Sequence, residues 1–102
     1  MVIEKSLLAE FKNKHNIVVG KQQVRRGLLE GVVSLVVLAV DTTPKYQLSI
    51  IRPCQIHNVP ITRVGNAKAL GIAVGINVKA GCVGILNSAN IDIGTVGIYK
   101  YR

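Results

Sequence analysis

Apolar residues along the chain switch repeatedly between helical and strand spacing. Val24 and Leu28 lie one helical turn apart, and Gly31 follows in the position of a C-terminal helix cap. Leu35–Val40, by contrast, is a continuous apolar run, typical of a strand buried on both faces of a sheet. The pattern predicts four helices, over residues 4–15, 22–30, 44–57 and 67–74. It predicts four strands between and after them, over residues 17–19, 35–40, 61–64 and 80–86.

Capping residues support two of the predicted helix starts, and a proline interrupts the third helix. Thr43 and Pro44 suit an N-cap followed by a first-turn proline, and Asn66 can cap the fourth helix. Pro53 falls inside the third helix, where a proline costs about 3 kcal/mol, so we expect a kink or an early end there. The segment 81–84, Gly-Cys-Val-Gly, lacks the lysine and serine of a phosphate-binding loop, and its glycines favour tight strand packing.

The alternation of helices and strands predicts the fold class. With no linker between them, the elements imply an α/β protein in which helices cover a sheet. We expect a single domain over residues 1–102, of which residues 87–102 form a C-terminal tail. Gly20 and Gly65 each follow a predicted strand and precede a helix, where α/β sheets tend to bind ligands.

Charge narrows the range of partners. The chain has a formal net charge of +8 and an isoelectric point near 9.9. Its basic residues are concentrated where carboxylates are absent, between Glu10 and Glu30 and between Asp41 and Asp92. Acid-free stretches of this kind indicate a polyanionic partner. The alternative is a basic surface that only keeps a small protein in solution.

The start of the second helix holds the clearest candidate site. A helix N-terminus leaves backbone N–H groups unpaired and attracts phosphate, and Lys21, Arg25 and Arg26 add positive charge there. Gln22 and Gln23 carry amides that both donate and accept, which suits reading the edge of a purine. Arg26 lies one turn beyond both glutamines, so all three can address one ligand. The alternative is an ordinary solvated helix face.

Few residues favour other chemistry. Five carboxylates make paired-acid catalysis and oxygen-ligand metal sites poor candidates. Cys54 and His57 lie three residues apart, but no second ligand pair or orienting group accompanies them. We therefore expect no enzyme, no cofactor and no metal site, and we expect Cys54 and Cys82 to be buried thiols. Only four aromatic residues are present, which argues against base-stacking platforms and favours a structured RNA with a distorted groove.

No segment of the sequence suggests export or a membrane. Glu4, Lys5, Glu10 and Lys12 interrupt what would be the apolar part of a signal peptide. The longest apolar run, over residues 31–40, is about half the length of a membrane span. We expect a cytoplasmic protein without a membrane partner, present as a monomer.

Several segments together resemble the large-subunit ribosomal protein 7Ae/30e family, whose members bind kink-turn RNA. These segments are Gly20–Leu28, Leu35–Ala39, Asp41–Pro44, Val59-Pro60 and Leu70–Gly75, in this order and at the family's spacing. The similarity runs from about residue 5 to residue 86. It implies a compact α/β/α sandwich, here a single-domain three-layer sandwich with a small mixed four-stranded sheet.

The resemblance also implies an RNA site. The family signature Gly-x-Asn-Glu-x-x-Lys falls on Gly20, Gln22, Gln23 and Arg26. Gln22 keeps the amide of the family asparagine, Gln23 exchanges a pure acceptor for an amide, and Arg26 keeps the lysine charge. Bacterial relatives are altered in a similar way.

A second family contact loop follows the third predicted strand, where an apolar residue packs against a flipped base. Its positions here are Arg63, Val64, Gly65 and Asn66. Two family features are replaced, because Val40 and Glu30 stand where a Glu and an Arg are common. The resemblance implies recognition of a sharply bent RNA with tandem G·A pairs, in a ribosome or another ribonucleoprotein. The rival function is a protein-interaction module of the same fold that has lost specific RNA binding.

Overall fold

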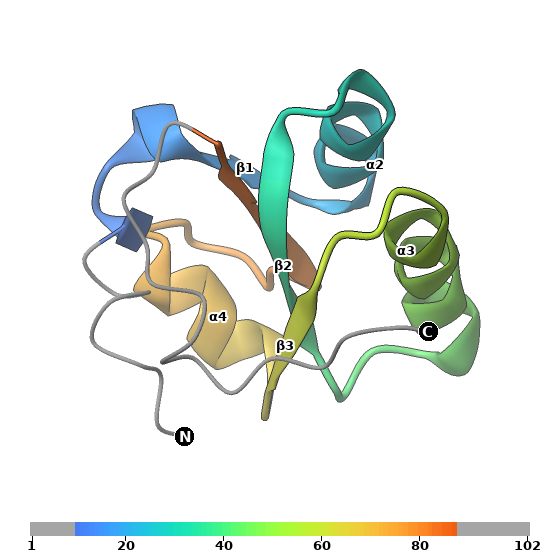
Figure 1. The fold of residues 1–102 in the computed structure, drawn as a ribbon. Coiled ribbons are helices and arrows are strands. Elements are labelled where there is room, and N and C mark those ends of the chain that lie inside the picture. Colours follow the sequence, from blue (N-terminus) through green and yellow to red (C-terminus); the bar gives the residue numbers. More distant parts are fainter. Residues whose placement is uncertain (1–9, 88–102) are drawn as a thin grey trace.

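A mixed four-stranded sheet forms the middle of the molecule in the computed structural model, which describes residues 10–87 (Figure 1). The strands are β1 (Ile17–Val19), β2 (Val33–Ala39), β3 (Ile61–Val64) and β4 (Cys82–Leu86). Their order across the sheet is β1-β4-β2-β3. The last strand is thus inserted between the first two, antiparallel to both, whereas β2 and β3 are parallel.

Helices cover both faces of this sheet. The helical elements are η1 (Lys14–Asn16, a 3-10 turn), α2 (Lys21–Glu30), α3 (Pro44–Ile56) and α4 (Ala67–Ala73). Helices α2 and α3 lie side by side on one face, and α4 lies on the other (Figure 1). The expected three-layer α/β/α sandwich with a mixed four-stranded sheet is confirmed. Among the helices of residues 10–87, none has the length and apolar character needed to cross a bilayer.

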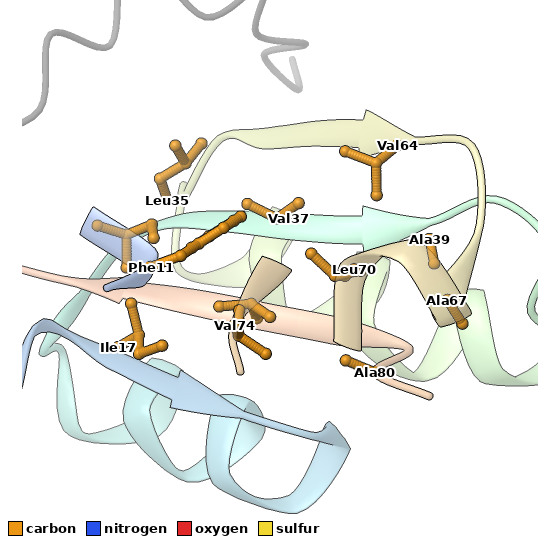
Figure 2. Close-up of a cluster of buried hydrophobic side chains, with 12 residues drawn as sticks. Phe11, Ile17, Leu35, Val37, Ala39, Val64, Ala67, Leu70, Val74 and Ala80 are labelled. Atoms are coloured by element: carbon orange, nitrogen blue, oxygen red, sulfur yellow. The ribbon is translucent and has the colours of Figure 1, made fainter. Parts of the chain in front are cut away.

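Two apolar clusters hold the layers together. On one face, Phe11 packs with residues of the strands and with Leu70 and Val74 of α4 (Figure 2). On the other face, the inward residues of α2 and α3 pack on the sheet; Val24 and Ile50 are completely buried there. Every residue of β2 from 35 to 39 is buried, as expected for a central strand with helices on both faces.

The predicted helix caps are confirmed. Thr43 Oγ1 accepts from the Tyr46 N–H at 3.1 Å, with Pro44 in the first turn of α3. Asn66 Oδ1 accepts from the Ala69 N–H at 2.6 Å at the start of α4. Gly31 ends α2 at a φ of +74°, in the left-handed region that favours glycine.

The end of the first predicted helix was wrong. The first predicted helix was expected to reach residue 15, but the helix ends at Phe11 and a separate turn, η1, follows, because the Asn13 side chain accepts from the His15 N–H. Helix α3 continues past Pro53 to Ile56, within one residue of its predicted end, so the early end expected as one of two effects of Pro53 does not occur. Pro53 lies in the last turn, where its missing N–H removes one bond near the end of the helix. Residues 4–9 of the first predicted helix and the tail beyond Asn87 lie outside the described residues.

Candidate nucleic-acid interface

Three helix N-termini lie along one edge of the sheet. Strands β1, β2 and β3 run in the same direction, and each is followed by a helix. Backbone bonds join the strand ends: the Gly20 N–H donates to the Cys82 carbonyl at 3.0 Å, and the Val40 N–H donates to the Val64 carbonyl at 2.9 Å. The partially positive starts of α2, α3 and α4 therefore share one side of the molecule.

Helix α2 begins immediately where β1 ends. Gly20 occupies the N-cap at a φ of +92° and has no side chain with which to cap the helix. The first helical bond runs from the Val24 N–H to the Gly20 carbonyl at 3.0 Å. The N–H groups of residues 21–23 precede that bond, so they point out of the helix toward the sheet edge, where an anion can accept from them.

The predicted polar residues of α2 are all on its exposed side. These residues are Lys21, Gln22, Gln23, Arg25 and Arg26. Arg26 stands between two hollows: it lines one on the α3 side together with Gln22 and Arg25, and one on the β1 side together with Gln23. The structure thus places Arg26 between the two glutamines, as the helical spacing predicts.

Lys21 lies against an aromatic ring of the next helix. Its Nζ is 5.5 Å from the centroid of Tyr46, in the first turn of α3. The Tyr46 hydroxyl and the Cys82 thiol share a hydrogen bond of 3.4 Å. Burial raises the pKa of Tyr46 well above its usual value. Burial also raises the pKa of Cys82 to about 11, whereas the hydrogen bond with the Tyr46 hydroxyl and the Lys21 charge lower the pKa of this thiol.

The second predicted segment lies at the opposite side of the same sheet edge. Arg63, Gly65 and Asn66 are exposed, whereas Val64 is 8% exposed and packs in the cluster beneath α4 (Figure 2). Asp41 Oδ1 accepts from the Ala67 N–H at 2.9 Å, which attaches the start of α4 to the loop after β2. Of the residues expected to contact RNA through side chains here, Arg63 and Asn66 are on the surface and Val64 is not.

The two segments are separated by the width of the sheet. Strands β1 and β3 are its outer strands, so the segments that follow them lie about 14 Å apart, at about 4.8 Å per strand. A shallow hollow lies between them. Its lining comes from Asp41, Thr42, Thr43, Tyr46, Ala67, Lys79 and Gly81. Sequence reasoning missed Tyr46 and Lys79, because only the fold brings α3 and the approach to β4 to this edge.

The cysteines and histidines do not form a shared site. Cys54 is completely buried among the residues between α3 and the sheet, whereas His57 is exposed at the end of α3. Cys54 and Cys82 are both free and buried, as expected. Within residues 10–87 no group of three or more His, Cys, Asp or Glu side chains is placed to hold a metal ion.

Comparison with known proteins agrees with this arrangement. The model of the ribosomal protein L7Ae/L30e/S12e/Gadd45 family matches residues 3–94. The chain belongs to this family. The resemblance inferred from residues 20–75 is therefore confirmed over nearly the whole chain.

Individual similar proteins are named as RNA-binding proteins. An RNA-binding protein of Geobacillus sp. strain WCH70 is 38% identical over 69 residues, covering 68% of this chain and 84% of the relative. RNA-binding protein YbxF of Geobacillus stearothermophilus is 37% identical over 70 residues, covering 69% of this chain and 85% of the relative. The 15.5 kDa RNA-binding protein of Giardia lamblia superposes with a TM-score of 0.72 at 26% identity, covering 80% of this chain and 72% of the other.

Proposed function

We propose that this family member is an RNA-binding protein that recognises a kink-turn and stabilises its bend. The observation that carries the proposal is the start of α2, where an uncapped glycine at the sheet edge is followed by five exposed polar side chains. The relatives named as RNA-binding proteins support the RNA part of the proposal. The resemblance of the α2 segment to the family signature supports the kink-turn part.

The residues of α2 divide into two roles. Lys21, Arg25 and Arg26 neutralise phosphates that approach the helix N-terminus. Gln22 and Gln23 read the edges of the G·A pairs, since an amide can both donate to and accept from a purine. Arg26 lies between the two glutamines, so it can contact either of the RNA strands that the glutamines read.

The segment after β3 supports the other side of the RNA. Gly65 and Asn66 form an exposed turn, and Arg63 adds a charge beside it. Val64 contributes without contacting the RNA, because its burial under α4 determines where the turn lies. A base that leaves the RNA stack would contact the backbone of residues 65–66 in the absence of an aromatic platform.

A protein-interaction module is the second candidate function. Leu29 and Ile56, on neighbouring helices, are 77% and 79% exposed, and they line the same hollow as Arg25. Exposed apolar side chains that cluster on a surface are typical of contact sites for other proteins. In the favoured proposal the chain acts in the cytoplasm, as a monomer and without catalysis, as a component of a ribonucleoprotein.

Binding to matched RNAs tests the proposal. Purified protein is titrated against a kink-turn RNA and against a control whose G·A pairs are replaced by Watson–Crick pairs. We expect tight binding to the kink-turn alone. The Gln23→Ala/Arg26→Ala variant should weaken it at least about tenfold, since each good base contact contributes about 1–3 kcal/mol of discrimination.

A second double variant serves as the control. Arg52 and Gln55 are also a cation and an amide three residues apart, both exposed on α3, but neither lines the hollows that hold Gln22, Gln23 and Arg26. Arg52→Ala/Gln55→Ala removes the same charge and should leave kink-turn affinity unchanged. Equal affinity for both RNAs would reduce the interaction to unspecific charge attraction, and absence of binding to either would favour the protein-interaction module.

A further inference from the structure

Tyr46 is held in place from three directions. Its backbone N–H is bonded to the Thr43 side chain, which fixes the first turn of α3. Its hydroxyl is bonded to Cys82, a completely buried residue of β4. The end of its ring lies against Gly81, where a Cβ would overlap the ring atoms. The ring is therefore a rigid surface at the edge of the sheet.

The Lys21 side chain lies over the ring of Tyr46. Its ammonium lies 5.5 Å from the ring centroid, within the range of a cation–π interaction. Lys21 is also the first residue of α2, beside the N–H groups that precede the first helical bond. The contact joins the first turn of α3 to the first turn of α2 within the proposed RNA interface.

We propose that Tyr46 is a positioning residue that holds the Lys21 ammonium at the N-terminus of α2, ready for an RNA phosphate. The proposal rests on the proposed RNA-binding function. A free lysine side chain has four rotatable bonds, and ordering it opposes binding. A lysine already held over a ring loses less freedom when the phosphate arrives. Tyr46 thus increases RNA affinity without contacting the RNA.

A double-mutant cycle tests the coupling. RNA affinity is measured for the wild type, Tyr46→Leu, Lys21→Gln and Lys21→Gln/Tyr46→Leu with a kink-turn RNA at fixed salt. Tyr46→Leu is expected to weaken binding roughly two- to fivefold, the range of an exposed cation–π contact. In the Lys21→Gln background the same change should have no further effect.

Two variants separate positioning from stability. Tyr46→Phe removes the bond to Cys82 but keeps the ring, so RNA affinity should stay near that of the wild type. Gly81→Ala keeps both Tyr46 and Lys21 but displaces the ring, so it should weaken binding as Tyr46→Leu does. Circular dichroism confirms that each variant is folded. An equal loss from Tyr46→Leu with and without Lys21, or no loss in either background, would overturn the positioning role.

An NMR measurement on the free protein is independent of RNA. Protons next to an ammonium that lies over an aromatic ring are shifted upfield by the ring current. The Lys21 Hε signals should show this shift in the wild type and in Tyr46→Phe, and lose it in Tyr46→Leu. If the wild type binds no kink-turn RNA, the proposed function fails, and the Hε shift alone still decides whether Tyr46 holds the ammonium; an unshifted signal contradicts the contact.

Discussion

At the residue scale, some positions are constrained by the nearest atom of another segment. Gly71 lies inside α4, where alanine would ordinarily be the better helix former by about 1 kcal/mol. A Cβ at this position would overlap the backbone carbonyl of Val78, in the segment that leads back to the sheet. A backbone atom cannot rotate away as a flexible side chain can.

Gly71→Ala is therefore expected to destabilise the protein by about 2 kcal/mol or more, despite the gain in helix propensity. The free energy of unfolding in urea measures this effect. The neighbouring Ile72 is 69% exposed, and Ile72→Ala should change stability by less than about 0.5 kcal/mol. Equal stability of Gly71→Ala and the wild type would show that the helix can move away from residue 78.

The two buried thiols should make the protein less stable at alkaline pH. Burial raises the pKa of Cys82 to about 11 and, together with the nearby Cys82, that of Cys54 to about 12, from an ordinary 9.0. Above pH 9 the unfolded chain releases thiol protons that the folded chain retains, so unfolding becomes more favourable. The loss should occur between about pH 9 and pH 11–12, at up to about 1.4 kcal/mol per pH unit for each thiol.

Urea unfolding at several pH values measures this slope. Other groups also lose protons at alkaline pH, so the comparison is with Cys54→Ala/Cys82→Ala. That variant is less stable at pH 7 because it leaves cavities, but its stability should fall less between pH 9 and pH 11. Parallel curves for the two proteins would contradict the assignment of the slope to the thiols.

At the element scale, α2 begins and ends on glycines with positive φ. Gly20 has a φ of +92° and Gly31 a φ of +74°, and a Cβ at either would meet no atom within 4 Å. Substitution is therefore opposed by backbone strain alone, and not by packing. The two ends differ in function, because only Gly20 adjoins the proposed RNA interface.

Gly20→Ala and Gly31→Ala should each destabilise the protein by about 1–2 kcal/mol. Only Gly20→Ala should also weaken binding to a kink-turn RNA, since it alters the N–H groups at the start of the helix. Thermal unfolding and RNA titration of both variants separate the two effects. A similar loss of affinity in both variants would mean that RNA binding follows the stability of α2 and not the geometry of its start.

At the scale of the whole molecule, the topology gathers positive potential on one side. Three parallel strands, each followed by a helix, bring three partially positive helix ends to one edge of the sheet. The net charge of +8 adds a long-range attraction for a polyanion. Such binding is opposed by salt, because each neutralised phosphate releases counterions.

RNA affinity should therefore fall linearly with salt concentration on logarithmic axes. Arg25→Gln and Arg26→Gln should each reduce the slope by about 1, the value for one phosphate contact. Lys14 is exposed in η1, before β1 begins and thus away from the interface, so Lys14→Gln should leave the slope unchanged. Titrations at four salt concentrations measure the slopes; equal reductions from all three substitutions would point to a diffuse charge effect.

Local sequence pattern was sufficient to predict the helices and strands and to propose half of the candidate site. Apolar spacing and capping residues located α2, α3 and α4, because helix starts and ends depend on residues only a few positions apart. The Lys21–Arg26 segment could be proposed as a site for the same reason, since all its members belong to one helix. Family resemblance added the segment after β3.

Contacts between distant segments depended on the fold. The insertion of β4 between β1 and β2, the pairing of Val64 with Ala39 and the position of the ring of Tyr46 beside Lys21 each join residues more than 15 positions apart. Sequence spacing carries no information about such pairs, because it records neighbours along the chain and not across the sheet. The polar residues proposed to bind RNA could therefore be identified from the sequence of one helix. The contacts that support them, and the sheet edge beside them, exist only once the sheet has assembled.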